Sequence, residues 1–524
     1  MKSRLDLSAA RRESRRRFLA VASALASSPF WGYPVYGQAK RDPKLPGEPF
    51  TLGVASGEPS FDGFVIWTRL APEPITGGGL PAEAYEVDYE VAQDEGFEKI
   101  VRKGTAIASP HLGHSVHVEV EGLAPGRPYF YRFRVGDHES PVGHTKTAPA
   151  LDATPDKLRF AFASCQHWES GYFTAFEHMA KEDLDLVIHL GDYIYEYAGK
   201  DGLVRKHVGK EIESLDDYRN RLAQYKTDRH LQETHRLFPW LVTWDDHEFD
   251  NDYATLISEE QGIDPNHFYD RRANSYQAYY EHMPLRRQQS PSGAFLRLYR
   301  RAPWGRLAEF AVLDTRQYRT DQPGGGRNQV PPPEATSPQS SMLGAEQERW
   351  LDRTLAASGG IWNVLAQQVM IGRIDRKIGE EFAYSMDQWP GYELPRRKLL
   401  QGLADANISN PVVLTGDIHS NWVNDLALDW EGGSAKVVAT EFVGTSITSG
   451  GNGKRLAEQE AAHMTENPFL HFYSAERGYV SCTVTPTEWK SDYQAVEFVD
   501  KPGAPLITRA SFVVEAGEAG AKEA

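Results

Sequence analysis

The segment that decides the fold is LVIHLGDYIY, residues 186–195. Its first five residues form a continuous apolar run, which is typical of a strand buried on both faces of a sheet. Gly191 and Asp192 follow directly, where such a strand ends. In an α/β layer the ends of parallel strands meet at one edge, and functional side chains gather there. Residues 186–195 therefore predict a sheet covered by helices, with polar chemistry at the carboxyl ends of its strands.

Three further apolar strands end in the same way. SCQ at 164–166, DDHE at 245–248 and GDIH at 416–419 each follow a predicted buried strand. Each motif alone carries little weight, because Gly-Asp pairs and acidic runs are common at protein surfaces. Four of them, each after a buried strand, predict a shared metal site. The side chains expected there are Cys165, Asp192, Tyr195, Asp246, His247, Asp417 and His419.

The α/β pattern extends over residues 156–500. Further strands are predicted at 308–313 and 362–370, and a helix at 172–181, whereas the Pro/Gly/Gln-rich segment 321–341 reads as a surface loop. Residues 501–524 are expected to form a last strand and a small, acidic, disordered tail. With 524 residues the chain is too long for one ordinary domain.

Residues 42–150 have an all-β pattern. Alternating or β-branched runs lie at 64–67, 85–91 and 114–120. A turn at 122–128 leads into YFYRF at 129–133, which is how a tyrosine corner begins a strand. We therefore expect a small immunoglobulin-like or fibronectin-like sandwich, joined by a linker at 149–155.

Residues 1–39 have the composition of an export leader. SRRRFL at 14–19 is similar to the twin-arginine pattern Ser-Arg-Arg-x-Phe-Leu, an Ala-rich apolar run follows, and Gly37-Gln38-Ala39 is a small-residue cleavage site. The apolar run is too short for a membrane anchor. These features predict a periplasmic or secreted protein that uses the twin-arginine (Tat) translocation machinery and has no stable membrane insertion.

Charge narrows the choice of partners. The leader carries seven Lys/Arg and two Asp/Glu, so the rest of the chain has a formal net charge of −21, against −16 for the whole. Such a chain repels nucleic acid and anionic membranes unless bound cations supply a local field. A small phosphate ester held by metal ions remains compatible with this charge.

The two cysteines, Cys165 and Cys482, admit two interpretations. In an exported protein a pair of cysteines ordinarily forms a disulfide. Cys165, however, lies where a metal ligand is expected, and Cys482 lies in the strand-like run YVSCTV at 479–484. We therefore expect both thiols to be free, with Cys482 behaving as a small buried hydrophobe.

The ordered set of blocks resembles the metallophosphoesterase superfamily, in the arrangement of the purple acid phosphatases. GDYIY at 191–195 matches its Gly-Asp-x-x-Tyr block, while SCQ, DDHE, VLAQ at 364–367 and GDIH replace its other blocks. These replacements, with LDTRQYR at 313–319, GVASGEP at 53–59 and VIWTRL at 65–70, resemble the PhoD-type alkaline phosphatases. The resemblance covers about residues 50–498. It implies a four-layer α/β sandwich behind the N-terminal β domain.

The replaced ligands favour two different metals. Cys165 and Tyr195, with Asp192 and His419, offer a thiolate and a phenolate, which suit Fe³⁺. Asp192 would bridge to a second position with Asp246, Asp417 and Gln367, an all-oxygen set that suits Ca²⁺. The resemblance implies the same mixture, with an additional Ca²⁺ near Asp245, Asp250 or Asp252.

The expected reaction is hydrolysis of phosphate monoesters or diesters by attack of a metal-bound hydroxide, without a side-chain nucleophile. His247 is the expected general acid or transition-state donor, with a purely structural histidine as the alternative. Arg316 could hold a phosphate oxygen in a bidentate contact or form a salt bridge with a local acid. His189, on the buried strand, is more readily a core residue than a ligand.

Two other functions stay open at this stage. One is a phospholipase D-like phosphodiesterase acting on lipid or polymer headgroups, with segments 199–215 and 321–341 shaping the mouth of its pocket. The other is a catalytically silent binding protein stabilised by metal. The presence of His247 in the third block argues against a silent protein.

Overall fold

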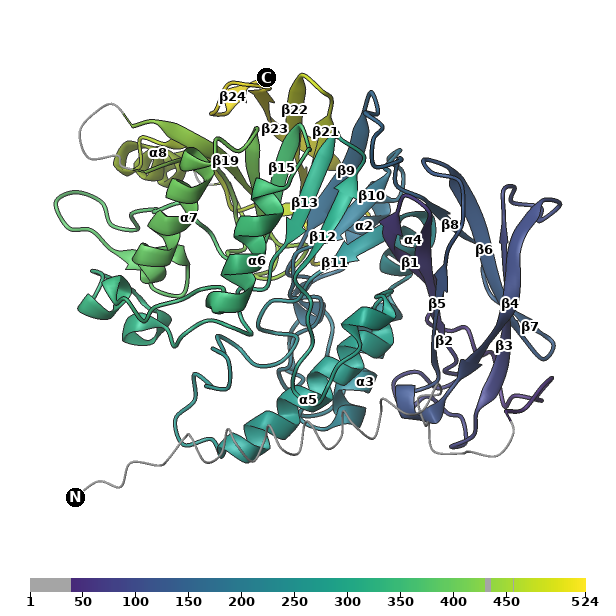
Figure 1. Cartoon of the computed structure of the whole chain (residues 1–524). Coiled ribbons are helices and arrows are strands. Elements are labelled where there is room, and N and C mark those ends of the chain that lie inside the picture. The colour runs from purple at the N-terminus through teal and green to yellow at the C-terminus, as the bar shows by residue number, and fades with distance from the viewer. Residues whose placement is uncertain (1–38, 429–434, 456) are drawn as a thin grey trace, which may run out of the picture.

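The computed structural model describes residues 39–428, 435–455 and 457–524 (Figure 1). The predicted export leader lies outside these residues except for Ala39. In the described part of the chain, no helix is long and apolar enough to cross a membrane.

Ten strands form the larger sheet, in the order β24-β23-β22-β21-β9-β10-β11-β1-β2-β5. β9, β10, β11 and β1 run parallel to one another at its centre. The apolar runs predicted from the sequence therefore lie in the middle of the sheet, where both faces are covered. Its strands are β1 (Val54–Ser60), β2 (Gly63–Arg69), β5 (Ser115–Val120), β9 (Leu158–Ala163), β10 (Leu186–His189), β11 (Pro239–Val242), β21 (Arg477–Val484), β22 (Glu488–Val496), β23 (Leu506–Glu515) and β24 (Lys522–Glu523).

Seven strands form a second sheet, in the order β12-β13-β15-β17-β19-β18-β20. β13, β15, β17 and β19 are parallel to one another. Its strands are β12 (Arg300–Trp304), β13 (Ala308–Val312), β15 (Trp362–Ala366), β17 (Pro411–Thr415), β18 (Asn421–Ala427), β19 (Val437–Val443) and β20 (Leu470–Ser474). A two-stranded ribbon of β14 (Asn328–Gln329) and β16 (Tyr384–Ser385) lies apart from both sheets.

The two sheets pack face to face through one apolar core. Phe160 and Ile188 of the larger sheet belong to the same buried cluster as Phe310 and Val364 of the smaller one. A second cluster joins the outer face of the larger sheet to α2 (Thr174–Met179), α3 (Leu215–Lys226), α4 (Arg229–Leu237) and α5 (Pro265–His282). A third joins the outer face of the smaller sheet to α6 (Gly344–Ala356) and α7 (Glu393–Asp405), as Figure 1 shows. The helix α8 (Ala457–Glu466) packs beside β20.

The helices over the larger sheet begin at capping residues visible in the sequence. Ser214 and Asp217 form a reciprocal capping box at the start of α3, which satisfies two backbone N–H groups. Asp264 accepts a hydrogen bond from the backbone N–H of Asn266, and Pro265 occupies the first turn of α5. These starts fix where the chain leaves the loops that carry the polar side chains.

The N-terminal β region is tied to the larger sheet. A five-stranded sheet of β3 (Tyr85–Ala92), β4 (Ile100–Ala108), β6 (Pro128–Val135), β7 (His138–Glu139) and β8 (Gly143–Lys146) packs on β1, β2 and β5 through a separate apolar cluster. β1 in turn pairs in parallel with β11. The second layer of the expected sandwich is thus the edge of the ten-stranded sheet and not a sheet of its own. The predicted tyrosine corner is present, because Tyr129 Oη accepts a hydrogen bond from Ala124 N at 3.1 Å.

The prediction of a disordered tail is wrong. β23 pairs with β22 over its whole length, and the chain then turns back so that β24 pairs with β23. Gly517 N donates to Asn410 Oδ1 at 2.7 Å, and Ala521 N donates to Asp425 Oδ1 at 3.0 Å. Small acidic composition suggested disorder, but these side chains and the open sheet edge give the tail's backbone its hydrogen-bond partners.

Candidate metal and catalytic site

The candidate site lies where the parallel strands of both sheets end. Cys165 follows β9, Asp192 follows β10, Asp246 follows β11, and Asp417 follows β17. Several of these turns use the left-handed backbone conformation at residues other than glycine, which is uncommon and concentrated at functional sites. Their φ angles are 59° at Cys165, 55° at Asp192, 62° at Asp417 and 56° at His419. The structure thus brings the four predicted loops together.

One part of the site, here called the Cys165 group, consists of Cys165, Asp192, Tyr195 and His419. Ligand atoms of Cys165, Asp192 and His419 all lie within 4.8 Å of one another. Tyr195 Oη donates to Asp192 Oδ2 at 2.9 Å and lies 3.2 Å from His419 Nε2. Burial, and then the Asp192 carboxylate, raises the pKa of both the Cys165 thiol and the Tyr195 hydroxyl well above their usual values. A bound cation is what would stabilise these groups as anions.

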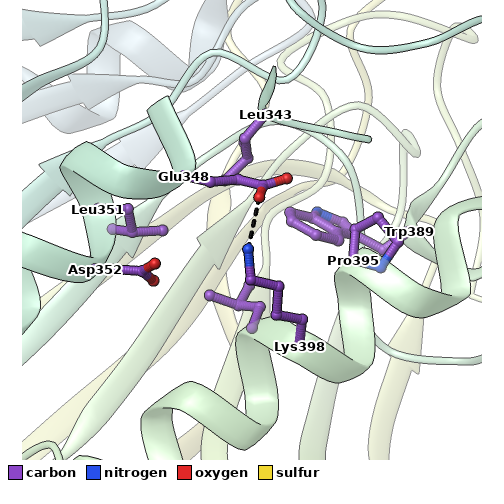
Figure 2. A pocket seen from close by; sticks show the side chains of 8 residues that line it. Leu343, Glu348, Leu351, Asp352, Trp389, Pro395 and Lys398 are labelled. Atoms are coloured by element: carbon purple, nitrogen blue, oxygen red, sulfur yellow. Dashed lines mark hydrogen bonds and ion pairs between the residues drawn. The ribbon is translucent and has the colours of Figure 1, made fainter. Parts of the chain in front are cut away.

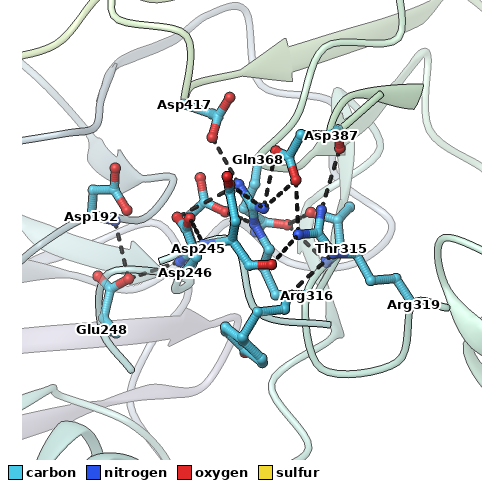
Figure 3. A network of polar contacts seen from close by, with 12 residues as sticks. Asp192, Asp245, Asp246, Glu248, Thr315, Arg316, Arg319, Gln368, Asp387 and Asp417 are labelled. Atoms are coloured by element: carbon cyan, nitrogen blue, oxygen red, sulfur yellow. Dashed lines mark hydrogen bonds and ion pairs between the residues drawn. The ribbon is translucent and has the colours of Figure 1, made fainter. Parts of the chain in front are cut away.

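The other part, here called the Arg316 group, consists of Arg316 and five aspartates around it: Asp245, Asp246, Asp252, Asp387 and Asp417. Figure 3 labels Arg316 and all of these aspartates except Asp252. Arg316 is fully buried. Its Nη1 lies 3.0 Å from Asp387 Oδ1, its Nη2 lies 2.8 Å from Asp417 Oδ1, and its Nε donates to Asp245. Asp246 and Asp252 complete the ring of carboxylates at 3.5 and 3.7 Å. Burial alone would lower the pKa of Arg316, but these carboxylates raise it well above its usual value.

The residues present fit metal ions because Arg316, together with Arg319 on Asp387, does not satisfy this much negative charge. Asp192 Oδ1, Asp245 Oδ2 and Asp246 Oδ1 are buried and have no hydrogen-bond partner among the described residues. Ligand atoms of Asp245, Asp246 and Asp417 lie within 4.8 Å of one another. Buried carboxylate oxygens without a donor are costly, and cations are the usual way to compensate them. The Cys165 group offers sulfur, nitrogen and oxygen ligands, whereas the Arg316 group offers only oxygen.

Glu248 holds the two loops that meet between these groups. Its Oε2 accepts hydrogen bonds from Asp192 N at 3.1 Å and Asp245 N at 2.8 Å, and its Oε1 accepts one from Tyr193 N. Burial raises the pKa of Glu248 to about 8, although these backbone donors oppose the rise. The last residue of the DDHE block therefore fixes the loops that carry Asp192 and Asp246.

His247 lies beside Asp192 and Asp246, and ligand atoms of the three residues are within 4.8 Å of one another. Its Nδ1 is 2.8 Å from Glu196 Oε2, and Glu196 Oε1 accepts a hydrogen bond from Asn251 N at 3.0 Å. Burial opposes protonation, but Glu196, Asp192 and Asp246 raise the pKa of His247 well above its usual value. These carboxylates therefore favour the protonated imidazole, which is the form from which a general acid donates its proton.

Gln367 and Asp250 have hydrogen-bond or ion-pair partners other than those expected from the sequence, and Arg316 has one of the two kinds of contact expected. Gln367 donates through Nε2 to Thr415 Oγ1 at 2.7 Å and accepts from Trp389 Nε1 at 3.1 Å, so its amide is engaged away from the aspartates. Asp250 pairs with Arg271 at 2.8 Å instead of joining the Arg316 group. Every guanidinium nitrogen of Arg316 has a carboxylate neighbour, so the salt bridges of the second alternative are present, and the phosphate contact stays a prediction.

Several functional neighbours were missed from the sequence. Asp387 contacts Arg316, and Gln388 Nε2 donates to Asp417. Both lie between the two-residue strand β16 and a short 3₁₀ helix, and β16 belongs to neither large sheet, so the pattern of apolar strands did not indicate them. Ser449, whose Oγ lies 2.6 Å from Tyr195 Oη, follows the strand β19 closely. The small polar run TSITS at 445–449 could have indicated it.

The remaining predictions concern the two cysteines and His189. Cys165 and Cys482 are both free and buried, as expected. His189 is fully buried between the rings of Tyr193 and Trp240, which makes it a core histidine. A small pocket between α6 and α7, lined by Leu343, Glu348, Trp389 and Lys398 among others, contains none of the predicted site residues (Figure 2).

Comparison with known proteins gives, for most of the chain, the same family as the motifs in the sequence. Residues 160–493 match the family model described as PhoD-like phosphatase, and residues 37–149 match the one for the PhoD-like phosphatase N-terminal domain. Alkaline phosphatase D of Bacillus subtilis (strain 168) is 51% identical over 486 residues, covering 92% of this chain and 83% of that protein.

A solved structure titled "Structure of PhoD" superposes with a TM-score of 0.89 at 51% identity, covering 92% of this chain and 93% of the other. This similarity extends over both the N-terminal β region and the two facing sheets. The chain therefore belongs to the PhoD-like phosphatase family and is a phosphoric ester hydrolase.

Proposed function

We propose that this protein hydrolyses phosphate monoesters and diesters at the joined Cys165 and Arg316 groups, using two kinds of metal ion. The observation that carries the proposal is the position of Asp192. Its Oδ2 contacts Tyr195, while its Oδ1 is buried without a donor and the residue also groups with Asp246 and His247. One carboxylate facing two chemically distinct ligand sets is the geometry of a bridge between two cations.

The proposed metals follow from the ligand types. Cys165, Asp192, Tyr195 and His419 would hold Fe³⁺, since thiolate and phenolate are strongly donating anions. Asp192, Asp246 and Asp417 would hold Ca²⁺, with Asp245 and Asp387 available for a second Ca²⁺. When bound, such ions lower the pKa of water and neutralise the charge of a phosphoryl group. Gln367 is left out of this assignment, because its amide is engaged by Thr415 and Trp389.

His247 is proposed as the proton donor to the leaving oxygen. Glu196 fixes its Nδ1, which leaves Nε2 free to be directed toward the cluster. Arg316 is proposed to act indirectly, by holding Asp245, Asp387 and Asp417 in the geometry that cations need.

The test is metal analysis of the purified protein together with assays on a chromogenic monoester and a chromogenic diester. We expect iron and calcium in the same preparation, activity that chelation removes, and recovery only when both metals return. Loss of His247 in His247→Gln should lower kcat by about 10²- to 10⁴-fold and leave the metal content unchanged. Full activity with calcium alone would contradict the two-metal assignment. Activity on the diester only would indicate a phosphodiesterase.

Export through the twin-arginine route is also proposed, on the sequence SRRRFL at 14–19. Replacing Arg15 and Arg16 by Lys in the full chain should keep the protein inside the cell in an uncleaved form. A matched change at Arg11 and Arg12, outside the motif, should leave export intact. Unchanged export of the Arg15/Arg16 variant would reject the route.

A further inference from the structure

A second cluster of ligand-type side chains lies behind Tyr195, outside the site described above. His167, Glu169 and His207 each offer one atom, and these atoms lie within 4.8 Å of one another. The rings of His167 and His207 meet edge to face at 5.3 Å, and His167 also packs against the ring of Tyr195 at 4.6 Å. Neither Glu169 nor His207 takes part in the phosphatase chemistry proposed above.

Only one of the two carboxylate oxygens of Glu169 accepts hydrogen bonds. Its Oε1 accepts hydrogen bonds from Lys200 N at 2.8 Å and His207 N at 3.0 Å. Its Oε2 is fully buried and has no hydrogen-bond partner among the described residues. The nearest cationic-type atom is His207 Nδ1 at 3.5 Å, beyond a good hydrogen bond. A buried carboxylate oxygen left in this state requires a compensating positive charge.

His167 is arranged as a metal-bound histidine usually is, whereas both ring nitrogens of His207 have hydrogen-bond partners. His167 Nε2 is buried without a partner, while its Nδ1 lies 2.6 Å from Ser170 Oγ. His207 Nε2 lies 2.9 Å from Tyr225 Oη. A metal-ligating histidine typically donates its other ring N–H to an oxygen acceptor, and Ser170 and Tyr225 supply one each. His167 would thus bind through Nε2 and His207 through Nδ1, releasing the contact of that Nδ1 with Tyr197 O at 3.1 Å.

We propose that His167, Glu169 and His207 form an additional metal site, separate from the catalytic cluster, which binds a divalent transition ion of the Zn²⁺ class. Two imidazoles and one carboxylate suit such ions, whereas Ca²⁺ prefers oxygen alone and Fe³⁺ prefers the anionic ligands around Cys165. The ion would join the loop after β9 to the segment 199–209. Glu169 O already accepts hydrogen bonds from Val204 N and Arg205 N of that segment, so the metal would strengthen an existing contact.

Nearby cations do not occupy the position proposed for the metal. Arg205 is paired with Asp228 at 2.8 Å, and Arg221 donates to the carbonyl oxygen of Tyr195. Burial lowers the pKa of His207 to about 2, with a further contribution from Arg221, which favours the neutral imidazole. Its Nδ1 now donates to Tyr197 O, so binding a metal through Nδ1 requires the other tautomer, in which Nε2 donates to Tyr225 Oη.

The experiment measures zinc in the iron- and calcium-loaded protein after equilibration with micromolar Zn²⁺ and gel filtration. We expect wild-type protein to retain about one equivalent more zinc than His207→Gln or Glu169→Gln, at equal iron and calcium content. The matched control is His235→Gln. His235 is also buried, and its Nε2 lies 2.8 Å from Tyr193 Oη, but it belongs to no ligand cluster in the described part of the chain. This control should retain zinc as wild type does.

X-ray absorption at the zinc edge of wild-type protein identifies the ligand atoms of the zinc, and it does so even if the variants do not fold. Two imidazoles with oxygen ligands and no sulfur would support the site. Sulfur scattering would place the zinc at Cys165, and equal zinc content in wild type and both variants would show non-specific binding. Either of these results, or no retained zinc in wild type, overturns the proposal.

Discussion

The Cys165 group and the Arg316 group lie at the same edge of the fold, and Asp192 of the first also groups with Asp246 of the second, yet the two differ in how their charge is compensated. In the Cys165 group the thiol and the phenol have raised pKa values, so a bound cation is needed to favour their anionic forms. In the second, a fully buried arginine already faces five aspartates. The Cys165 group would therefore become anionic only by losing protons to a bound metal. The Arg316 group already holds anionic carboxylates, which are paired with a guanidinium.

On the proposed assignment, this difference would let a single site select two metals. Ligands that must lose protons respond strongly to a highly charged ion such as Fe³⁺, because its field lowers their pKa. Carboxylates held in place by Arg316 are preorganised for a harder, less charged ion with oxygen ligands. The comparison predicts that variants in the two groups fail in different ways.

The largest effect is expected at Asp192, which lies between the two groups. Asp192→Asn removes the bridging charge from both groups, so iron and calcium should both be lost or weakened. Since each metal contributes several kcal/mol to the transition state, kcat/KM on a chromogenic monoester should fall by about 10⁴-fold or more. Elemental analysis accompanies the assay. Retention of both metals at wild-type stoichiometry would show that Asp192 does not bridge the groups.

Arg316→Met tests the role of the buried guanidinium among the aspartates. Removing it leaves Asp245, Asp387 and Asp417 without their common partner, which should lower the free energy of unfolding by about 3–5 kcal/mol in chelator. Calcium should restore part of this loss, because the ion replaces the missing charge.

The matched control for Arg316→Met is Arg300→Met, which removes another buried arginine. Arg300 pairs with Glu58, away from the aspartates. Its variant should also be destabilised, but calcium should not help it. Thermal unfolding of both variants with and without calcium makes the measurement. An equal calcium response in the two would mean that Arg316 has no special relation to the metal position.

Cys165→Ser should affect one metal only. Serine is a weaker anionic donor, so we expect loss of iron and of any thiolate charge-transfer absorption, with calcium retained. Activity should fall by at least about tenfold, since even partners outside the coordination sphere matter this much. Cys482→Ser, a buried change beside Ser491, serves as the control and should keep the spectrum. Joint loss of calcium would contradict the separation of the two groups.

The strand-end pattern predicted Asp192, Asp246, Asp417 and His419 because long-range convergence of parallel strands follows from the fold class alone. It could not predict Asp387 and Gln388, which follow only the two-residue strand β16, a strand outside both sheets and without an apolar run. Nor could it tell that Gln367 turns toward Trp389, since side-chain direction after a strand depends on neighbours distant in sequence. The same limit applied to the N-terminal region, where β-strand periodicity did not reveal that β1 joins the larger sheet through β11.

The last prediction uses as a reference a buried lysine that forms no ion pair with an aspartate in the described part of the chain. Lys226 is buried against Trp67 and His235, and burial lowers its pKa to about 7. In the unfolded chain the pKa of lysine is about 10.4, so between these values the unfolded state binds more protons. Stability should therefore rise with pH from about 7 to 10, by at most about 1.4 kcal/mol per pH unit from this group. Lys226→Met should flatten that part of the pH–stability curve, measured by urea unfolding at constant calcium, whereas Arg316→Met should leave its slope unchanged. Identical slopes for wild type and Lys226→Met would show that Lys226 stays charged, and that a buried cation in this fold does not need carboxylates to remain so.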